Sequence, residues 1–244
     1  MKSKTLWLII IALMSINLSA AKVLIVVTNH SELGDSGKKT GYYLPEVTHP
    51  YFKFVEAGHE VDFASPLGGK APMDEKSRDL SDSYNKKFLD NPNLIGQLDK
   101  TIALSKIKPK DYQAIVFAGG HGTMWDFRSS KVIKNLTREI YEKGGIVAAV
   151  CHGPAALLDV ALSNGQYLLK NRKVTGFTNE EEEIVKLTKT MPFLLETKMR
   201  EQGATFLKAD PWQEKVVTDQ RVVTGQNPAS ASKLALEVIK LIKK

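Results

Sequence analysis

The single cysteine of the chain, Cys151, is followed at once by His152 in the stretch Cys-His-Gly-Pro. The residues before it, 146–150, form a continuous apolar run that is typical of a buried strand, and helix-favouring residues follow at 155–158. A strand that turns sharply into a helix presents the side chain of the turn at the carboxyl edge of a sheet, where open α/β folds bind ligands. Because a helix N-terminus favours the thiolate, we expect Cys151 to have a lowered pKa and to act as a nucleophile.

A glycine-rich segment, Gly119-Gly120-His121-Gly122, follows a second apolar run at residues 114–117. Glycines leave backbone N–H groups free to point into a shared pocket, and such groups can hold an oxyanion. We therefore expect the N–H groups of Gly120 and His152 to form an oxyanion hole, with Gly119 and His121 beside the substrate.

These two segments need a sheet whose strands end side by side. Apolar runs at residues 23–27, 114–117 and 146–150 alternate with helical patterns, for example at residues 132–141, where Gly144 can close the helix. This alternation predicts an α/β protein with a parallel sheet covered by helices.

The rest of the mature chain fits one domain, residues 22–244. A last apolar stripe over residues 231–242 predicts a helix that packs on the sheet, with Asn227 as its cap and Pro228 at its first position. Residues 66–110 are rich in polar residues and break the alternation, and we expect an excursion there with one or two short helices.

Residues 1–21 have the pattern of a secretory signal peptide. Two lysines precede an apolar run at residues 6–14, and small residues suit cleavage near Ala20 or Ala21. The apolar run is shorter than the roughly 20 residues that span a bilayer. We therefore expect a periplasmic or secreted protein without stable membrane anchoring.

Composition removes several classes of protein. One cysteine in 244 residues excludes an internal disulfide and a cysteine-cluster zinc site. The formal charge of +7 falls to +5 without Lys2 and Lys4, and the basic residues are scattered, so we expect no nucleic-acid partner. His30, His49 and His59 lack the tight spacing of metal ligands, and we predict no metal site.

The sequence resembles the ThiJ/PfpI superfamily, which has a class I glutamine-amidotransferase-like fold. Within that superfamily, Gly-His-Gly-Thr and Gly-Gln-Asn-Pro-Ala-Ser resemble the heat-shock-chaperone-like glyoxalase III branch. The matching segments besides the opening strand and the cysteine turn are residues 39–46, 58–65, 118–126, 175–182 and 224–230.

This resemblance implies a flavodoxin-like, doubly wound, mostly parallel sheet sandwiched by helices, with a cysteine nucleophile elbow. It also implies that Glu46 contacts Cys151, and that an acidic residue orienting His152 lies in the run Glu180 to Glu183, where Glu182 aligns best. It further implies a homodimer.

The residue types permit a glutathione-independent glyoxalase that converts methylglyoxal or related 2-oxoaldehydes to 2-hydroxy acids such as D-lactate. Cys151 would form a hemithioacetal, and Glu46 would move a proton between the two carbons. No glutathione, metal or nucleotide is required. The alternatives are a protein deglycase, a cysteine hydrolase or peptidase, and a holding chaperone or redox stress protein. Export is unexpected because relatives are mostly cytosolic.

Overall fold

The computed structural model describes residues 20–243. Of the predicted signal peptide only Ala20 and Ala21 fall within this range, and the rest of that prediction lies outside the described residues. Ala21 is buried, and its carbonyl accepts the N–H of Glu60 at 2.9 Å, so this residue is already part of the fold.

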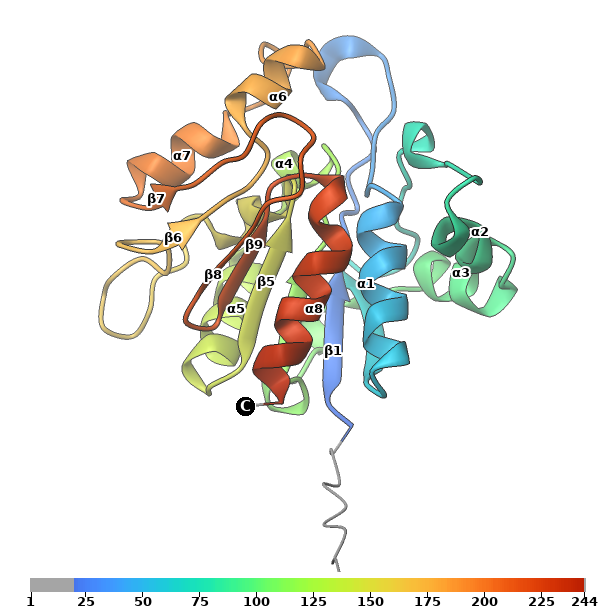
Figure 1. Ribbon diagram of the computed structural model, residues 1–244, viewed down its shortest axis with the longest axis horizontal. Coiled ribbons are helices and arrows are strands. Elements are labelled where there is room, and N and C mark those ends of the chain that lie inside the picture. The colour runs from blue at the N-terminus through green and yellow to red at the C-terminus, as the bar shows by residue number, and fades with distance from the viewer. Residues whose placement is uncertain (1–19, 244) are drawn as a thin grey trace, which may run out of the picture.

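The centre of the molecule is a seven-stranded sheet (Figure 1). Its order is β3-β2-β1-β4-β5-β9-β8, and every pair is parallel except β8 and β9. The strands are Ile102–Ala103, Glu60–Ser65, Lys22–Val26, Ala114–Phe117, Ile146–Val150, Val222–Gly225 and Val216–Asp219, named in the same order. The order reverses between β1 and β4, and ligands of open α/β sheets bind outside the carboxyl ends of strands at such a reversal.

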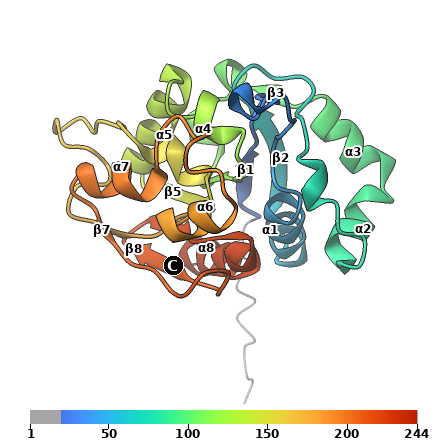
Figure 2. The ribbon, with the colours of Figure 1, turned by 90° about the horizontal axis from the view of Figure 1, so that it is seen from above.

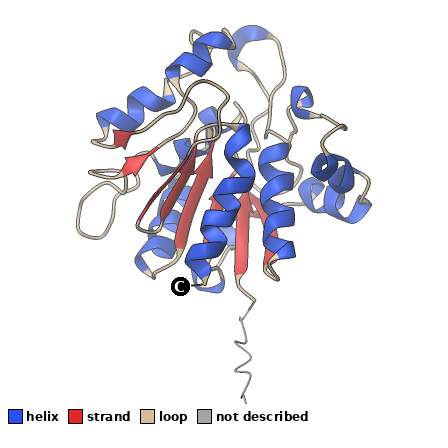
Figure 3. Ribbon diagram, in the orientation of Figure 1, coloured by secondary structure: helices blue, strands red, loops and turns tan. Residues whose placement is uncertain are grey.

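Helices cover both faces of the sheet (Figures 2 and 3). Helices α1 (Pro45–Glu56) and α8 (Ala231–Ile242) pack together on one face, and α5 (Lys131–Glu142) packs against β4 and β5 on the other. The predicted mostly parallel sheet between helices is confirmed. Within residues 20–243 no helix combines the length and the apolar character needed to cross a membrane.

Helix α5 ends before Gly144, as its sequence predicts, and begins with a serine cap. The Ser130 hydroxyl accepts the N–H of Ile133 at 3.2 Å, which caps the first turn. Ile133, Leu136 and Ile140 form its buried stripe, and Gly144 follows the helix with a left-handed φ of 90°.

The expected cap of the last helix is wrong. Pro228–Ser230 forms a 3-10 turn before α8, and the Asn227 side chain makes no cap hydrogen bond. Its amide donates instead to Glu181 Oε1 at 2.8 Å and to the carbonyl of Gln213 at 2.9 Å. Asn227 therefore ties the start of the helix to a distant buried carboxylate, which its sequence position does not reveal.

Two segments lie outside the regular alternation. Residues 66–110 contain α2 (Ser83–Leu89), α3 (Pro92–Asp99) and the edge strand β3. Residues 173–206 hold β6 (Lys173–Val174), α6 (Asn179–Ile184), α7 (Leu195–Glu201) and β7 (Thr205–Phe206), with β6 and β7 paired in a small sheet. Helix α6 lies beyond the carboxyl ends of β5 and β9 (Figure 1). Further helical pieces are α4 (Thr123–Asp126) and the 3-10 turns Gly34–Ser36, Glu75–Ser77, Leu104–Lys106 and Pro109–Asp111.

Candidate active site

Cys151 stands at a sharp turn directly after β5. Its φ of 59° is left-handed, a conformation that a residue with a side chain seldom adopts. Hydrogen bonds on both sides hold it there: the N–H of Cys151 donates to the carbonyl of Gly225, and its carbonyl accepts the N–H of Phe177 at 2.8 Å. Backbone strain that is fixed by its surroundings is typical of functional sites.

The segment after the cysteine differs from the expected helix. Gly153–Leu157 forms a 3-10 turn, and Leu158 is already extended. A 3-10 turn this short does not offer the aligned dipoles of a longer α-helix. Burial, together with the neighbouring Glu46 carboxyl, raises the pKa of Cys151 well above its ordinary value, and the N–H of Gly120 only partly opposes this. The predicted low pKa is therefore wrong: the resting cysteine is a thiol.

His152 connects the thiol to Glu182. Its Nδ1 lies 3.3 Å from Cys151 Sγ, and its Nε2 lies 2.8 Å from Glu182 Oε2. Burial would raise the pKa of Glu182, but His152 and His121 outweigh it and lower that pKa to about 2. Because the carboxylate is ionised, it can only accept, so His152 places its proton on Nε2. The Nδ1 atom is then free to take the thiol proton.

His121 is a second partner of the same carboxylate. Its Nε2 lies 3.0 Å from Glu182 Oε1, and its ring centroid lies 4.2 Å from that of His152. Burial and the adjacent His121 lower the pKa of His152, although Glu182 opposes them. His152 is therefore neutral at neutral pH, as a proton acceptor must be.

Glu46 lies in the first turn of α1 and is fully buried beside Cys151. Burial raises its pKa to about 8, while the contact with Cys151 and the hydrogen bond from the N–H of Gly119 act in the opposite direction. The Gly119 N–H donates to Oε2 at 2.7 Å, and Oε1 has no regular hydrogen-bond partner within the described residues. One carboxyl oxygen is thus fixed, and the other is free for chemistry.

Two glycines of the loop after β4, Gly119 and Gly120, have different roles. Gly120 has a left-handed φ of 98°, and a Cβ there would lie 2.2 Å from the carbonyl oxygen of Gly41, so only glycine fits. Its N–H donates toward the Cys151 sulfur and is placed to meet an oxyanion at a carbon bound to that sulfur. Gly119 differs from its expected role, because its N–H is already engaged by Glu46.

His121, His152 and Glu182 bring together nitrogen and oxygen atoms of the kind that bind metal ions. The ligand atoms of His121, His152 and Glu182 lie within 4.8 Å of one another, a donor set that zinc accepts in proteins. Both oxygens of Glu182 are occupied by imidazoles, so hydrogen bonds within the cluster already satisfy it.

Comparison with known proteins identifies the family. The model of the DJ-1/PfpI family matches residues 39–241, which include Glu46, Cys151, His152 and Glu182. The chain belongs to the DJ-1/PfpI family.

Several relatives match this DJ-1/PfpI chain over most of its length. Glyoxalase 3 of Candida albicans is 35% identical, over 89% of this chain and 97% of its own. The glutathione-independent glyoxalase HSP31 of Saccharomyces cerevisiae is also 35% identical, over 91% and 98%. The crystal structure of glyoxalase III from Candida albicans aligns with a TM-score of 0.85 over 91% and 97% of the two chains. Rapid Encystment Protein of Francisella tularensis aligns with a TM-score of 0.88 at 42% identity, over 91% and 99%.

The four consecutive glutamates of this DJ-1/PfpI chain, residues 180–183, have different roles. Glu182 faces the histidines, while Glu180 pairs with Lys208 at the surface and Glu183 is exposed. Glu181 is fully buried, and its Oε1 accepts hydrogen bonds from Trp212, Gln226 and Asn227. Sequence reasoning missed Glu181, although Thr178-x-x-Glu181 is the pattern of a capping box, and the structure contains that box.

A cavity of about 180 Å³ opens above Cys151. Gly120, His121, Cys151 and His152 form its polar end, and apolar side chains that include Phe177 and Trp212 line much of the remainder. Trp212 has no role in the predicted site, since its place in the chain carries no signal of proximity to the cysteine.

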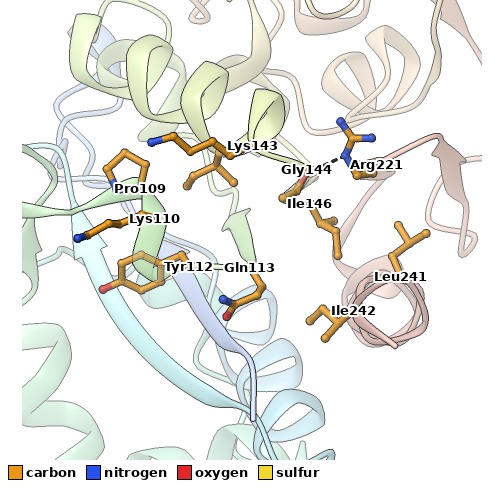
Figure 4. A pocket seen from close by; sticks show the side chains of 12 residues that line it. Pro109, Lys110, Tyr112, Gln113, Lys143, Gly144, Ile146, Arg221, Leu241 and Ile242 are labelled. Atoms are coloured by element: carbon orange, nitrogen blue, oxygen red, sulfur yellow. Dashed lines mark hydrogen bonds between the residues drawn. The ribbon is translucent and has the colours of Figure 1, made fainter. Parts of the chain in front are cut away.

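A larger cavity of about 650 Å³ lies at the opposite end of the sheet (Figure 4). Gln113 and Ile146, which flank the amino ends of β4 and β5, line it together with Arg221 and Ile242. Among the described residues, its lining includes none of the predicted site residues. The larger cavity therefore lies away from the candidate catalytic residues, and the smaller cavity, which Cys151 lines, is the candidate active site.

Proposed function

We propose that the protein is a glutathione-independent glyoxalase that converts 2-oxoaldehydes to 2-hydroxy acids. The observation that carries the proposal is that the buried Glu46 carboxyl lies beside Cys151. The thiol of Cys151 is hydrogen-bonded to His152, which is in turn hydrogen-bonded to Glu182. Simple acyl transfer needs a nucleophile, a base and an orienting acid, and has no use for a second carboxyl at the sulfur. The names of the two 35% identical relatives support the same activity.

The first step is addition of the thiol to the aldehyde carbon. A bond forms between Sγ of Cys151 and the carbon, and the thiol proton moves to Nδ1 of His152, which lies 3.3 Å from the sulfur. The imidazolium that forms is stabilised by Glu182. The N–H groups of Gly120 and His152 stabilise the oxygen anion until it gains a proton and becomes a hemithioacetal.

The second step moves hydrogen between the two carbons. Glu46 in its ionised form removes the proton from the hemithioacetal carbon, which gives an enediol, and returns it to the former ketone carbon. The aldehyde carbon is thereby oxidised and the ketone carbon reduced, so no external oxidant or reductant is needed. A carboxyl with a pKa of about 8 suits this exchange, because it is mostly protonated at neutral pH and yet ionises within about one pH unit of neutrality.

The third step is hydrolysis of the resulting thioester by water. The carbon–sulfur bond breaks, the 2-hydroxy acid leaves, and Cys151 regains its proton. Methylglyoxal plus water thus becomes lactate. We assign this conversion to the lyase class rather than to the hydrolases, since the net reaction adds water to the substrate without hydrolysing any of its bonds.

The test is purified protein with methylglyoxal in the absence of any thiol cofactor, with lactate as the product measured. Wild type is expected to form lactate, and Cys151→Ala and Glu46→Gln are expected to lose it. Lactate formation that survives Cys151→Ala would refute this mechanism. Release of a fluorophore from short peptides by wild type, lost in Cys151→Ala, without lactate formation would instead support a peptidase.

We propose further that residues 1–21 direct export to the periplasm. The basic and apolar pattern of these residues supports this. Cell fractionation of the full chain against a variant lacking residues 2–19 tests it. Equal distribution of the two variants would contradict export.

We also propose a homodimer, on the basis of the resemblance to the superfamily. Light scattering of the purified protein is expected to give about twice the mass of one chain. A mass of one chain across the working concentration range would contradict this.

A further inference from the structure

The cavity above Cys151 has one reactive end and one apolar wall. The reactive end consists of Gly120, His121, Cys151 and His152. The apolar wall consists of Leu33, Phe177, Val185, Leu187 and Trp212, and the remaining lining residues are Tyr43, Asp74, Lys76 and Pro228. Phe177 connects the two parts, because its ring centroid lies 4.3 Å from that of His152 and 5.8 Å from that of Trp212.

The volume of this cavity exceeds what methylglyoxal needs. Methylglyoxal carries only a methyl group on its ketone carbon. A cavity of roughly 150 Å³ lined by apolar side chains accommodates a benzene ring in another protein. At about 180 Å³, this cavity is large enough for a ring-sized group.

Trp212 is held in an unusual backbone conformation at the edge of this wall. Its φ is 65°, which is an outlier for so bulky a side chain. The N–H of Trp212 donates to Glu181 Oε1 at 3.0 Å, and the same oxygen accepts the amides of Gln226 and Asn227. Such strain persists only where the surroundings fix it, and here a fully buried carboxylate does so.

The indole is also more exposed than a packing role requires. Trp212 is 44% exposed although it lines the cavity. A substrate ring beside it would cover apolar surface on both partners and add an aromatic contact. A methyl group is too small to do the same.

We propose that Trp212, positioned by Glu181, determines specificity and makes the site prefer 2-oxoaldehydes with an apolar, ring-sized substituent on the ketone carbon over methylglyoxal. This inference rests on the proposed glyoxalase function. The wall would hold the substituent while the aldehyde carbon meets Sγ of Cys151, so that part of the binding energy of the ring serves to orient the reacting carbons.

The experiment compares initial rates with phenylglyoxal, which yields mandelate, and with methylglyoxal, which yields lactate. The quantity measured is the ratio of the two kcat/KM values. Wild type is expected to favour phenylglyoxal, and Trp212→Gly to lower the ratio about tenfold or more. Glycine is the chosen truncation because it adopts the left-handed turn without strain. Trp212→Phe keeps an aromatic wall and is expected to retain most of the preference.

Trp125→Ala is the matched control. Trp125 stacks on His30 at a centroid distance of 4.9 Å and lines two other cavities. Its removal is expected to leave the ratio at the wild-type value, and a fall equal to that of Trp212→Gly would overturn the assignment to Trp212.

The two hypotheses fail in different ways. If wild type forms neither lactate nor mandelate, the proposed function itself is wrong. If wild type forms lactate but does not favour phenylglyoxal, or if Trp212→Gly keeps the wild-type ratio, only the specificity inference is wrong.

Discussion

At the scale of single residues, the decisive feature is where the protons reside. Burial raises the pKa of both Cys151 and Glu46, so the thiol and the carboxyl are both largely protonated at neutral pH. The ionised member of the site is Glu182, which two imidazoles hold as a carboxylate. Activation of the thiol is therefore a transfer to His152 during attack rather than a standing thiolate.

Removal of the Glu46 charge should make Cys151 easier to ionise. After burial, the Glu46 charge is the next largest cause of the raised pKa of the thiol. In Glu46→Gln the rate of Cys151 alkylation by iodoacetamide is therefore expected to rise at lower pH than in wild type. Mass spectrometry across pH 7 to 10 measures this, and Glu56→Gln on the outer surface of α1 is the control. A shift to higher pH would show that Glu46 stabilises the thiolate instead.

Neighbouring glutamates provide a matched pair of variants. Glu182→Gln removes the carboxylate that stabilises the His152 imidazolium and is expected to reduce kcat at least 100-fold. Glu183→Gln changes an exposed carboxylate one residue away and is expected to leave kcat near wild type. Lactate formation from methylglyoxal measures both. An equal loss of kcat in the two variants would show that Glu182 has no specific role in catalysis.

At the scale of elements, α6 is the piece on which the site depends most. It presents two consecutive glutamates in different directions: Glu182 toward the histidines, and Glu181 toward Trp212 and the start of α8. Successive helix residues are rotated by about 100°. This rotation is why consecutive glutamates of one helix face different partners.

The cap of α6 should matter for both stability and catalysis. The Thr178 hydroxyl accepts the N–H of Glu181 at 3.0 Å, and Glu181 Oε2 accepts the N–H of Thr178 in return. Thr178→Ala is expected to lower the free energy of unfolding by about 1 kcal/mol and also to lower kcat, because α6 carries Glu182. Ser130→Ala removes the cap of α5, which carries no site residue, and is expected to cost similar stability with kcat unchanged. Chemical denaturation and lactate assays separate the two effects. If Thr178→Ala leaves kcat unchanged, as the control Ser130→Ala is expected to do, the cap does not position Glu182.

Local sequence predicts the elements of this site better than the contacts between them. The apolar runs identify β4 and β5 because both strands are buried on both faces. The turn after Cys151 is 3-10 rather than α-helical, which depends on the left-handed cysteine and on its bonds to Gly225 and Phe177. Trp212 and Asn227 reach the site through Glu181, a long-range contact that no local pattern encodes.

At the scale of the whole molecule, the buried Glu46 should cost stability as the pH rises. Its pKa is about 8 in the folded protein against an ordinary value of 4.5. Between these values the unfolded chain has lost the proton and the folded chain has kept it, so the free energy of unfolding falls with rising pH. Glu46→Gln removes this fall. Relative to wild type, the variant is expected to gain on the order of 3 kcal/mol between pH 5 and pH 8.

Urea denaturation of wild type and Glu46→Gln at the two pH values measures this gain. The comparison cancels the titration of the groups that do not contact position 46, which both proteins share. A difference between the two proteins that is the same at pH 5 and pH 8 would mean that Glu46 is ionised in the folded state at both.

The burial of Cys151 also has a consequence for the durability of the protein. Cys151 is only 3% exposed, and its sulfur keeps its proton at rest. Peroxide attacks thiolates, and the oxidation that follows becomes irreversible beyond the sulfenic acid. A nucleophile that ionises only when a carbonyl carbon is in place spends little time in the vulnerable form. In oxidising surroundings, the same low dielectric that makes the cysteine slow to ionise would lengthen the working life of each molecule.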